Sequence, residues 1–300
     1  MNVTTIEIEQ SKAAGMRERM AAYIELTKPR IAFMLVLTSA AGFYLGTKGG
    51  FDTVLFVNSM IGILLLAFGV ATLNQYIERD TDALMERTAK RPIPTQRLTA
   101  NEALIFGILQ CVVSEIYLYF LVNPLTAVLG LTVIVGYVFL YTPLKTRTSA
   151  STAIGAIPGA MPPLMGWTAA SNEITIGAWA LFAMLFLWQF PHFLAIAWMY
   201  KEQYAKAGIK MLPVIEPDGI ITARQIVLFT IMLVPISLAP FFLGFAGVIY
   251  LAGALMLGIW FLIESVITAR AKTVERARRL LMVSVIYLPL IFGLLVVDSR

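Results

Sequence analysis

The chain has 300 residues, of which 59% are hydrophobic and only 14% charged, and its formal net charge is +5. Soluble domains carry about a quarter charged residues, so this composition excludes an ordinary soluble protein and indicates an integral membrane protein. The single cysteine, Cys111, excludes an internal disulfide and a zinc site built from paired cysteines.

Long apolar runs make up most of the chain. Those long enough to cross about 30 Å of hydrocarbon as helices cover residues 31–48, 53–75, 102–121, 125–141, 152–170, 175–199, 226–246, 248–267 and 280–297. The sequence therefore predicts an all-α integral membrane protein, a bundle of nine transmembrane helices. We expect residues 1–25 to form a cytoplasmic N-terminal segment and residues 26–300 a single multi-pass domain.

The basic residues indicate which helix ends face the cytoplasm. If the runs alternate in direction, every Lys and Arg except Lys48 and Arg300 lies on the side of the N-terminus. We therefore expect the N-terminus in the cytoplasm and the C-terminus outside, in a bacterial-type plasma membrane, with a site that opens to the cytoplasm. The positive charge then matches anionic membrane lipid rather than nucleic acid, because no basic stripe is interleaved with stacking aromatic residues.

The first span begins with "LTKPRI", residues 26–31, in which Pro29 suits the start of a helix. Lys28 and Arg30 flank this proline. One interpretation is that they only anchor the helix at the positive side of the membrane. The other gives Arg30 a role in binding a phosphate group.

Polar residues follow the second apolar run in "NQYIERDTDALMERTAKRP", residues 74–92. If the helix continues past Leu73, Asn74, Glu78 and Asp82 share one face, because they are spaced by four. Acids at a membrane interface are costly and tend to be functional. An amide and two carboxylates are oxygen ligands that suit Mg²⁺ together with a substrate phosphate.

The rest of this stretch contains basic residues that could bind phosphate and charged residues without a proposed role. Arg87, Lys90 and Arg91 follow the acids by one or two turns and could hold phosphate oxygens, which arginine binds in a bidentate manner. We interpret the remaining charged residues as solvated side chains of a loop that sets topology. These are Arg79, Asp80, Glu86 and Arg97.

Two later stretches carry further candidates. Tyr141 and Lys145 are spaced by four at the end of the fourth run. The only histidine, His192, lies one helical turn after Trp188 and directly after Pro191, in "FLWQFPHFLAIAWMYKEQYAKAGIKMLPV", residues 186–214. A lone histidine is commonly a hydrogen-bonded core residue, but the helix-breaking proline and the nearby acid at position 202 favour a functional one.

The stretch at 74–92 resembles the first acidic motif of the UbiA-type intramembrane prenyltransferases, N-x3-D/E-x3-D continued by D-x2-M-x-R-T-x2-R. The resemblance implies that Asn74, Glu78 and Asp82 hold Mg²⁺ and an isoprenyl diphosphate, with Arg87 and Arg91 as phosphate partners. By the same likeness, "TKPR" directs Arg30 at the diphosphate. The element Y-x3-K brings Tyr141 and Lys145 to the departing diphosphate.

"WQFPHF" followed by Y-x2-AG-x2-MLP resembles one branch of that superfamily, the protohaem IX farnesyltransferases or haem O synthases. This implies farnesyl diphosphate and haem B as substrates and haem O as product, made for terminal oxidases, with a haem A synthase or oxidase assembly as a partner. It also implies that Trp188 and His192 contact haem and that His192 and Glu202 are catalytic. The branch usually has an acidic pair where this chain has Glu202 and Gln203. The extended pattern of the first acidic motif often has Gly where this chain has Gln96.

Three alternatives stay open. Another UbiA-type enzyme would prenylate an aromatic acid or a quinone precursor, against which "WQFPHF" speaks. A cation-coupled transporter would place its ionisable residues near the bilayer midplane on broken helices, whereas the acids here cluster at one membrane face. A haem-binding assembly factor without catalysis would not need the row of polar residues Asn74, Glu78 and Asp82.

Overall fold

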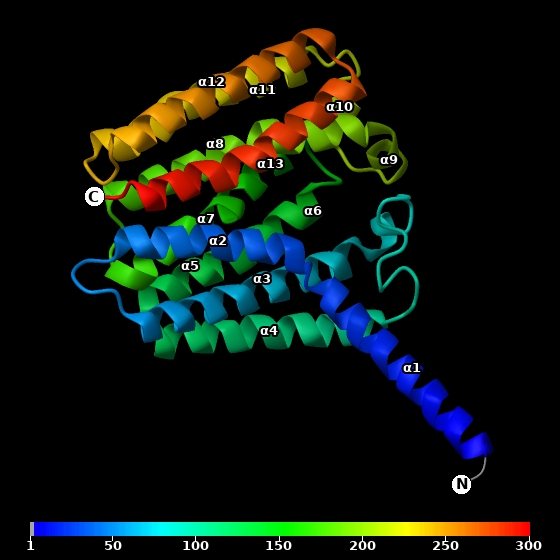
Figure 1. Cartoon of the computed structure of the whole chain (residues 1–300). Helices are drawn as coiled ribbons and strands as arrows, with labels where there is room; N and C mark the ends of the chain where they lie inside the picture. Colours follow the sequence, from blue (N-terminus) through cyan, green and yellow to red (C-terminus); the bar gives the residue numbers. More distant parts are fainter. Residues whose placement is uncertain (1–2) are drawn as a thin grey trace.

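The computed structural model describes residues 3–300, and it describes side chains from residue 15 onward. Figure 1 shows a bundle of long helices that run roughly alongside one another, with α1 (Val3–Leu26) extending from one end. The long helices of the bundle are α2 (Pro29–Gly46), α3 (Thr53–Asp82), α4 (Ala100–Leu121), α5 (Pro124–Ile134), α7 (Ser151–Ser171), α8 (Ile176–Met199), α11 (Ile220–Phe242), α12 (Val248–Ala271) and α13 (Val274–Val297).

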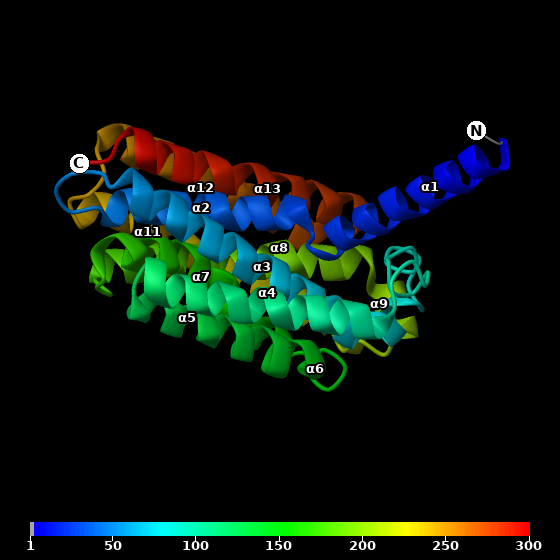
Figure 2. The same ribbon diagram turned by 90° about the horizontal axis from the view of Figure 1, so that it is seen from below.

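Short elements complete the chain. A π-helix, η1 (Val135–Tyr141), and α6 (Thr142–Leu144) continue α5 without a break, so that Pro124–Leu144 forms one apolar segment. The loop between α8 and α11 contains α9 (Lys201–Lys206) and α10 (Leu212–Ile215). Figure 2 shows α6 and α9 at the end of the bundle from which α1 leaves.

The predicted all-α membrane fold is confirmed. Within residues 3–300, eight segments are long and apolar enough to cross a membrane. The predicted span that is missing from these eight is α7, which contains Pro158, Pro162 and Pro163 and many small residues. Figure 1 shows α7 in the middle of the bundle, where most of its side chains are buried by protein rather than exposed to lipid.

Several helices extend beyond the apolar runs that predicted them. α3 continues to Asp82, seven residues past the end of the predicted span at 75. α11 begins at Ile220 rather than 226, because the carboxylate of Glu216 accepts hydrogen bonds from the backbone of Ile221 (2.8 Å) and Thr222 (3.2 Å). Hydropathy marks only the lipid-exposed part of a helix, whereas capping satisfies the exposed backbone donors at its true start.

The N-terminal segment, which the apolar pattern did not identify as helical, forms α1. Its last part is held to the bundle by an ion pair between Arg19 and Glu102, the residue that also completes the capping box of α4 with Thr99. The backbone then turns at Lys28, whose φ of 49° lies in the left-handed region, before Pro29 begins α2. Leu26 is fully buried at this turn.

Helices α2 and α7 approach each other through glycines. A side chain at Gly42 would overlap the carbonyl oxygen of Pro163, and one at Gly166 would overlap that of Ser39. Small residues at a helix interface allow this close approach in membranes, where packing rather than the hydrophobic effect holds helices together. The contact fixes two of the walls of the cavity described below.

Candidate active site

The bundle encloses a cavity of about 710 Å³ that is lined by α2, α3, α5 with η1, α7, α8 and α13. Its mouth lies at the end of the bundle near α6 and α9 and is polar, with Lys28, Arg30, Asn74, Glu78, Asp82, Arg87, Arg91, Tyr141, Lys145 and Tyr204. Its body is mainly apolar, with residues such as Leu66, Val70, Val133, Pro158, Met165 and Leu288. A volume of this size is typical of ligand sites.

The polar face predicted for α3 lies at this mouth. Asn74, Glu78 and Asp82 all line the cavity, because α3 stays helical through Asp82 and their spacing of four keeps them on one face. Glu78 Oε1 lies 2.6 Å from Lys145 Nζ, and Asp82 Oδ2 lies 2.5 Å from Arg91 Nη1. Each carboxylate is thus paired with a cation from a different segment.

Asn74 is oriented by two neighbours. Lys28 Nζ donates to its Oδ1 over 2.8 Å, and its Nδ2 donates to the hydroxyl of Thr142 over 3.2 Å. Thr142 in turn donates from that hydroxyl to the carbonyl of Tyr137 over 2.8 Å, at the end of the π-helix η1. A π-helical stretch within a helix is often found at a functional site, and here its Tyr137 carbonyl accepts the hydrogen bond from Thr142.

The two lysines at the mouth differ in electrostatics. Burial lowers the pKa of Lys28 to about 7, and the nearby positive charge of Arg91 acts in the same direction. Burial also acts to lower the pKa of Lys145, but the carboxylate of Glu78 outweighs it, so that the pKa of Lys145 is raised well above its ordinary value. Lys145 therefore stays charged, and its ammonium also lies 4.4 Å above the ring of Tyr141.

The side-chain oxygens of Asn74, Glu78 and Asp82 suit a hard cation that keeps part of its coordination shell for a substrate. Within the part of the chain whose side chains are described, Glu78 Oε2 and Asp82 Oδ1 have no protein partner, although both residues line the cavity. No group of three His, Cys, Asp or Glu side chains converges in that same part. Two carboxylates and an amide suit Mg²⁺, which binds one or two carboxylates and completes its shell with water and phosphate.

The arginines reach the mouth from the loop between α3 and α4. The guanidinium of Arg87 lies 5.0 Å from the ring centre of Tyr200 and donates to the hydroxyl of Tyr204 over 3.2 Å. The backbone N–H of Arg87 donates to Gln203 Oε1 over 3.2 Å. Arg30 lines the mouth from the first turn of α2. Both side chains are exposed and available to an anion.

Glu202 is the candidate that the structure does not bring to the site. Its side chain is exposed and does not line the cavity, whereas the neighbouring Gln203 faces Arg87. Gln203 does not line the cavity either, but its side-chain oxygen accepts from the backbone N–H of Arg87, which does.

The remaining candidates meet in the body of the cavity. Trp188 and His192 are one turn apart on α8, and their rings stack with centres 4.5 Å apart and planes inclined by 24°. Trp188 Nε1 donates to the carbonyl of Ser284 on α13 over 2.9 Å, and His192 Nδ1 lies 2.8 Å from the hydroxyl of that same serine. α8 remains one helix through Pro191.

The cavity, with its cationic and acidic mouth and its apolar body, agrees with comparisons to known proteins. The sequence pattern of the UbiA prenyltransferase family matches residues 35–287. The chain belongs to the UbiA prenyltransferase family. Its fold agrees, since a digeranylgeranylglyceryl phosphate synthase structure superposes with a TM-score of 0.79 and 16% identity over 94% of this chain and 98% of that one.

Other family members are similar over almost the whole chain. A protoheme IX farnesyltransferase from Solibacter usitatus is 49% identical, covering 93% of this chain and 99% of its own length, and one from Nitrosococcus oceani is 38% identical, covering 99% and 98%. The structure of a UbiA homologue from Archaeoglobus fulgidus bound to GPP and Mg²⁺ has a TM-score of 0.67 and 18% identity, covering 91% and 99%.

Three residues that line this UbiA-type cavity or contact its lining were not among the predicted site residues. Lys28 contacts Asn74 directly, and its place in "LTKPRI" beside Arg30 was a signal that pointed to it. Thr142 and Ser284 act through hydrogen bonds to Asn74 and His192. Neither of these two has a local sequence signal, because each meets its partner from a different helix.

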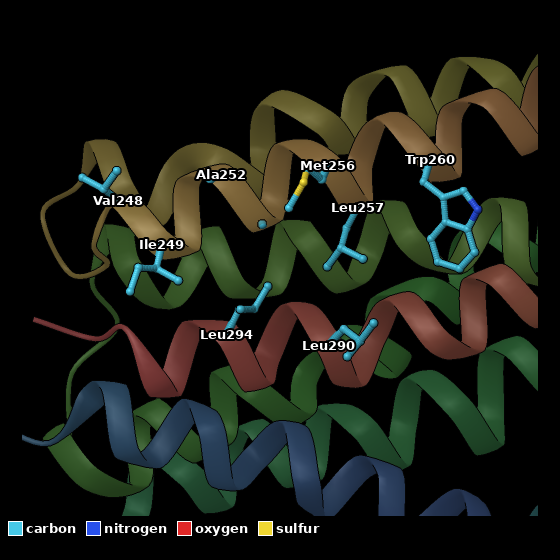
Figure 3. Close-up of a pocket in the computed structure, with 9 residues that line it drawn as sticks. Val248, Ile249, Ala252, Met256, Leu257, Trp260, Leu290 and Leu294 are labelled. Atoms are coloured by element: carbon cyan, nitrogen blue, oxygen red, sulfur yellow. The ribbon is translucent and has the colours of Figure 1, made fainter.

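A second hollow of about 730 Å³ lies between α12 and α13, and it is separate from the UbiA-type cavity. Figure 3 shows Ile249, Leu257, Trp260, Leu290 and others along its walls. Its lining side chains are apolar, apart from the indole N–H of Trp260, and none is ionisable. It lacks the groups that bind a phosphate or a metal, so we assign the chemistry to the cavity beside α3.

Proposed function

We propose that the protein transfers the farnesyl group of farnesyl diphosphate to a vinyl group of haem B, giving haem O. The observation that carries this proposal is one cavity that joins a mouth with five basic side chains and two carboxylates, besides its other polar groups, to a mainly apolar body. Relatives of 38–49% identity named protoheme IX farnesyltransferase support the choice of substrates. Support for Mg²⁺ comes from the donor set of α3 and from the related structure bound to GPP and Mg²⁺.

The mouth would bind the diphosphate. Asn74, Glu78 and Asp82 would hold Mg²⁺, which supplies charge neutralisation for the leaving group when it is bound. Arg30 and Arg87 contribute exposed guanidinium groups, and arginine matches phosphate oxygens in a bidentate manner. Arg91 and Lys145 already neutralise the two carboxylates and are close enough to shift toward an anion.

The reaction separates charge. The bond from C1 of the farnesyl chain to the diphosphate oxygen breaks, with the electron pair leaving on the diphosphate. C1 then bonds to the terminal carbon of the vinyl group, a water oxygen bonds to the adjacent carbon, and that water loses a proton. Preorganised cations at the mouth stabilise the leaving group, and such electrostatic stabilisation is commonly the largest catalytic contribution.

The body of the cavity suits the carbocation and the two apolar substrates. Its apolar walls exclude water before the acceptor is in place. The faces of Tyr137 and Tyr141, 4.8 Å apart between ring centres and adjacent to the mouth, can stabilise a cation by cation–π attraction. A farnesyl chain and a porphyrin both enter from the bilayer, in line with a site among membrane helices.

We also propose that the mouth faces the cytoplasm, with the N-terminus inside and the C-terminus outside. This orientation rests on the distribution of Lys and Arg among the loops. The membrane would then be the plasma membrane of a bacterial-type cell. Haem O would pass to a haem A synthase or to the assembly of a terminal oxidase.

The decisive experiment incubates the purified protein with haem B, farnesyl diphosphate and Mg²⁺ and analyses the extracted haem by chromatography. We expect a more hydrophobic haem with the mass of haem O, and none when Mg²⁺ is removed with a chelator. Failure to convert haem B, together with turnover of 4-hydroxybenzoate, would assign the protein to the aromatic-acid prenyltransferases instead.

A further inference from the structure

Ser284 on α13 makes two contacts with α8 and one within its own helix. Its carbonyl accepts from Trp188 Nε1 (2.9 Å), and its hydroxyl oxygen lies 2.8 Å from His192 Nδ1. The same hydroxyl donates to the carbonyl of Leu281 over 2.6 Å. Ser284 is fully buried, so water does not compete for these bonds.

The number of protons fixes the tautomer of His192. A carbonyl oxygen cannot donate, so in the contact with Leu281 the single hydroxyl proton of Ser284 is the one that is shared. Both contacts of the hydroxyl are hydrogen bonds only if His192 Nδ1 donates to Ser284. The imidazole therefore carries its proton on Nδ1, and Nε2 has a free lone pair.

The residues around the imidazole of His192 orient the lone pair of Nε2 toward the cavity. His192 lines the cavity, and within the region of described side chains its Nε2 has no hydrogen-bond partner and is not sealed inside the protein. Trp188 stacks on one face of the imidazole, and Phe193 lies edge-on with its ring centre 5.4 Å away. The ring is thus held with its acceptor nitrogen toward the cavity.

We propose that Ser284 is a positioning residue that holds His192 as the Nδ1–H tautomer, so that Nε2 binds the iron of the substrate haem. The inference rests on haem being the acceptor, as proposed above. A neutral imidazole that donates its other N–H to an oxygen is the usual form of a histidine bound to a metal, because the hydrogen bond fixes its orientation and raises its basicity. His192 is the only imidazole in the chain.

The test uses the full-length protein, purified with a tag that contains no histidine, and haem B added without farnesyl diphosphate. We expect the ferric and ferrous absorption spectra to show a nitrogen ligand on the iron. His192→Ala abolishes this signature, and added imidazole restores it by filling the space that the side chain leaves. Ser284→Ala weakens haem binding about tenfold, the effect of removing the hydrogen-bond partner of a metal ligand.

Two further variants separate positioning from general packing. Ser284→Thr keeps a hydroxyl at the same place and is expected to retain the ligated spectrum. Ser59→Ala removes another fully buried serine hydroxyl that donates within its own helix, to Leu55 over 2.6 Å, and is expected to leave haem binding unchanged. A wild-type spectrum in His192→Ala, or haem affinity in Ser284→Ala equal to that of Ser59→Ala, would overturn the proposal.

The same preparations distinguish this inference from the proposed function. Haem O formation by the wild-type protein is measured in parallel. If haem O forms while the spectrum does not depend on His192, iron ligation is wrong and farnesyl transfer stands. If no haem O forms, the proposed function fails, whatever the spectra show.

Discussion

Lys145 Nζ and Glu78 Oε1 lie 2.6 Å apart and join the start of the α6–α7 loop to α3 across the mouth of the cavity. The ion pair keeps Lys145 charged in spite of its burial, since the carboxylate raises its pKa. We expect Glu78 to bind Mg²⁺ when the magnesium diphosphate enters. The ammonium group of Lys145 is then free to move toward the phosphate oxygens. The resting ion pair would thus hold both groups ready for the leaving group.

Glu78→Gln tests this relationship. The substitution keeps the size of the side chain, removes the charge that would bind Mg²⁺ and leaves Lys145 without its partner. We expect farnesyl transfer to fall by at least about a hundredfold, as when one preorganised electrostatic group is removed from an active site. Asp80→Asn is the matched control, because its side chain is 85% exposed and does not line the cavity. Equal activity in the two variants would contradict the metal site.

Thr142→Val tests the orientation of Asn74. Valine has the shape of threonine but cannot accept from Asn74 Nδ2, so the amide is free to rotate its oxygen away from the mouth. We expect the Mg²⁺ concentration for half-maximal activity to rise about tenfold, as for other residues that orient a metal ligand. Thr142→Ser should behave as wild type. If serine and valine raise the Mg²⁺ requirement equally, the hydroxyl has no orienting role.

Gln96→Gly is expected to stabilise the protein. The backbone of Gln96 has a φ of 57°, in the left-handed region, and its side chain is exposed. Removing Cβ relieves a cost of about 1–2 kcal/mol, part of which is offset by the greater freedom of glycine in the unfolded chain. We expect a net gain of about 0.5–1 kcal/mol, measured as a higher midpoint of thermal unfolding in detergent. Gln96→Ala, which keeps Cβ, should show no gain.

Gly166→Ala should be strongly destabilising. The added methyl group would overlap the carbonyl oxygen of Ser39, and backbone on both sides cannot give way without separating α2 from α7. Overpacking of this kind costs about 1–3 kcal/mol. Gly293→Ala is the matched control in α13, where a Cβ meets nothing within 4 Å. Because alanine favours helix over glycine, we expect the control to be neutral or slightly stabilising. Thermal unfolding of both variants in one detergent gives the comparison.

The cap at the start of α11 gives a pH dependence of stability. Burial acts to raise the pKa of Glu216, but hydrogen bonds from Ile221 and Thr222 outweigh it and lower the pKa below its ordinary value. A carboxyl group whose pKa is lower in the folded state stabilises fully above its unfolded pKa and loses that contribution as the pH falls through its folded pKa.

Glu216→Gln keeps one acceptor oxygen but removes the charge and the second acceptor, so it should lower the unfolding midpoint at pH 7 by an amount that corresponds to less than the ~1 kcal/mol of a fully lost cap. As the pH falls below the ordinary range of a glutamate pKa, the difference between wild type and variant should shrink. Asp218→Asn serves as control. A difference that stays constant down to acidic pH would show that the charge of Glu216 is not what caps the helix.

Much of the fold was predictable because lipid imposes a simple rule. A segment in hydrocarbon must satisfy its own backbone hydrogen bonds, so long apolar runs become helices. The rule holds at α7, where the run predicted at 152–170 forms the helix Ser151–Ser171, although this helix is predominantly buried by protein and is not among the eight segments apolar enough to span a membrane. The rule did not identify α1, which has no apolar run. It also missed the ends of α3 and α11, where the helix continues into polar residues.

The sequence by itself determined which residues of α3 share a face, because helical periodicity relates positions that are close along the chain. It likewise indicated Arg87, Arg91, Tyr141 and Lys145 through their motif spacing. Only the tertiary structure decided that Lys145 pairs with Glu78, that Gln203 rather than Glu202 contacts Arg87, and that Ser284 contacts His192. These contacts join helices far apart in sequence, and their geometry depends on how the whole bundle packs, which no local pattern encodes.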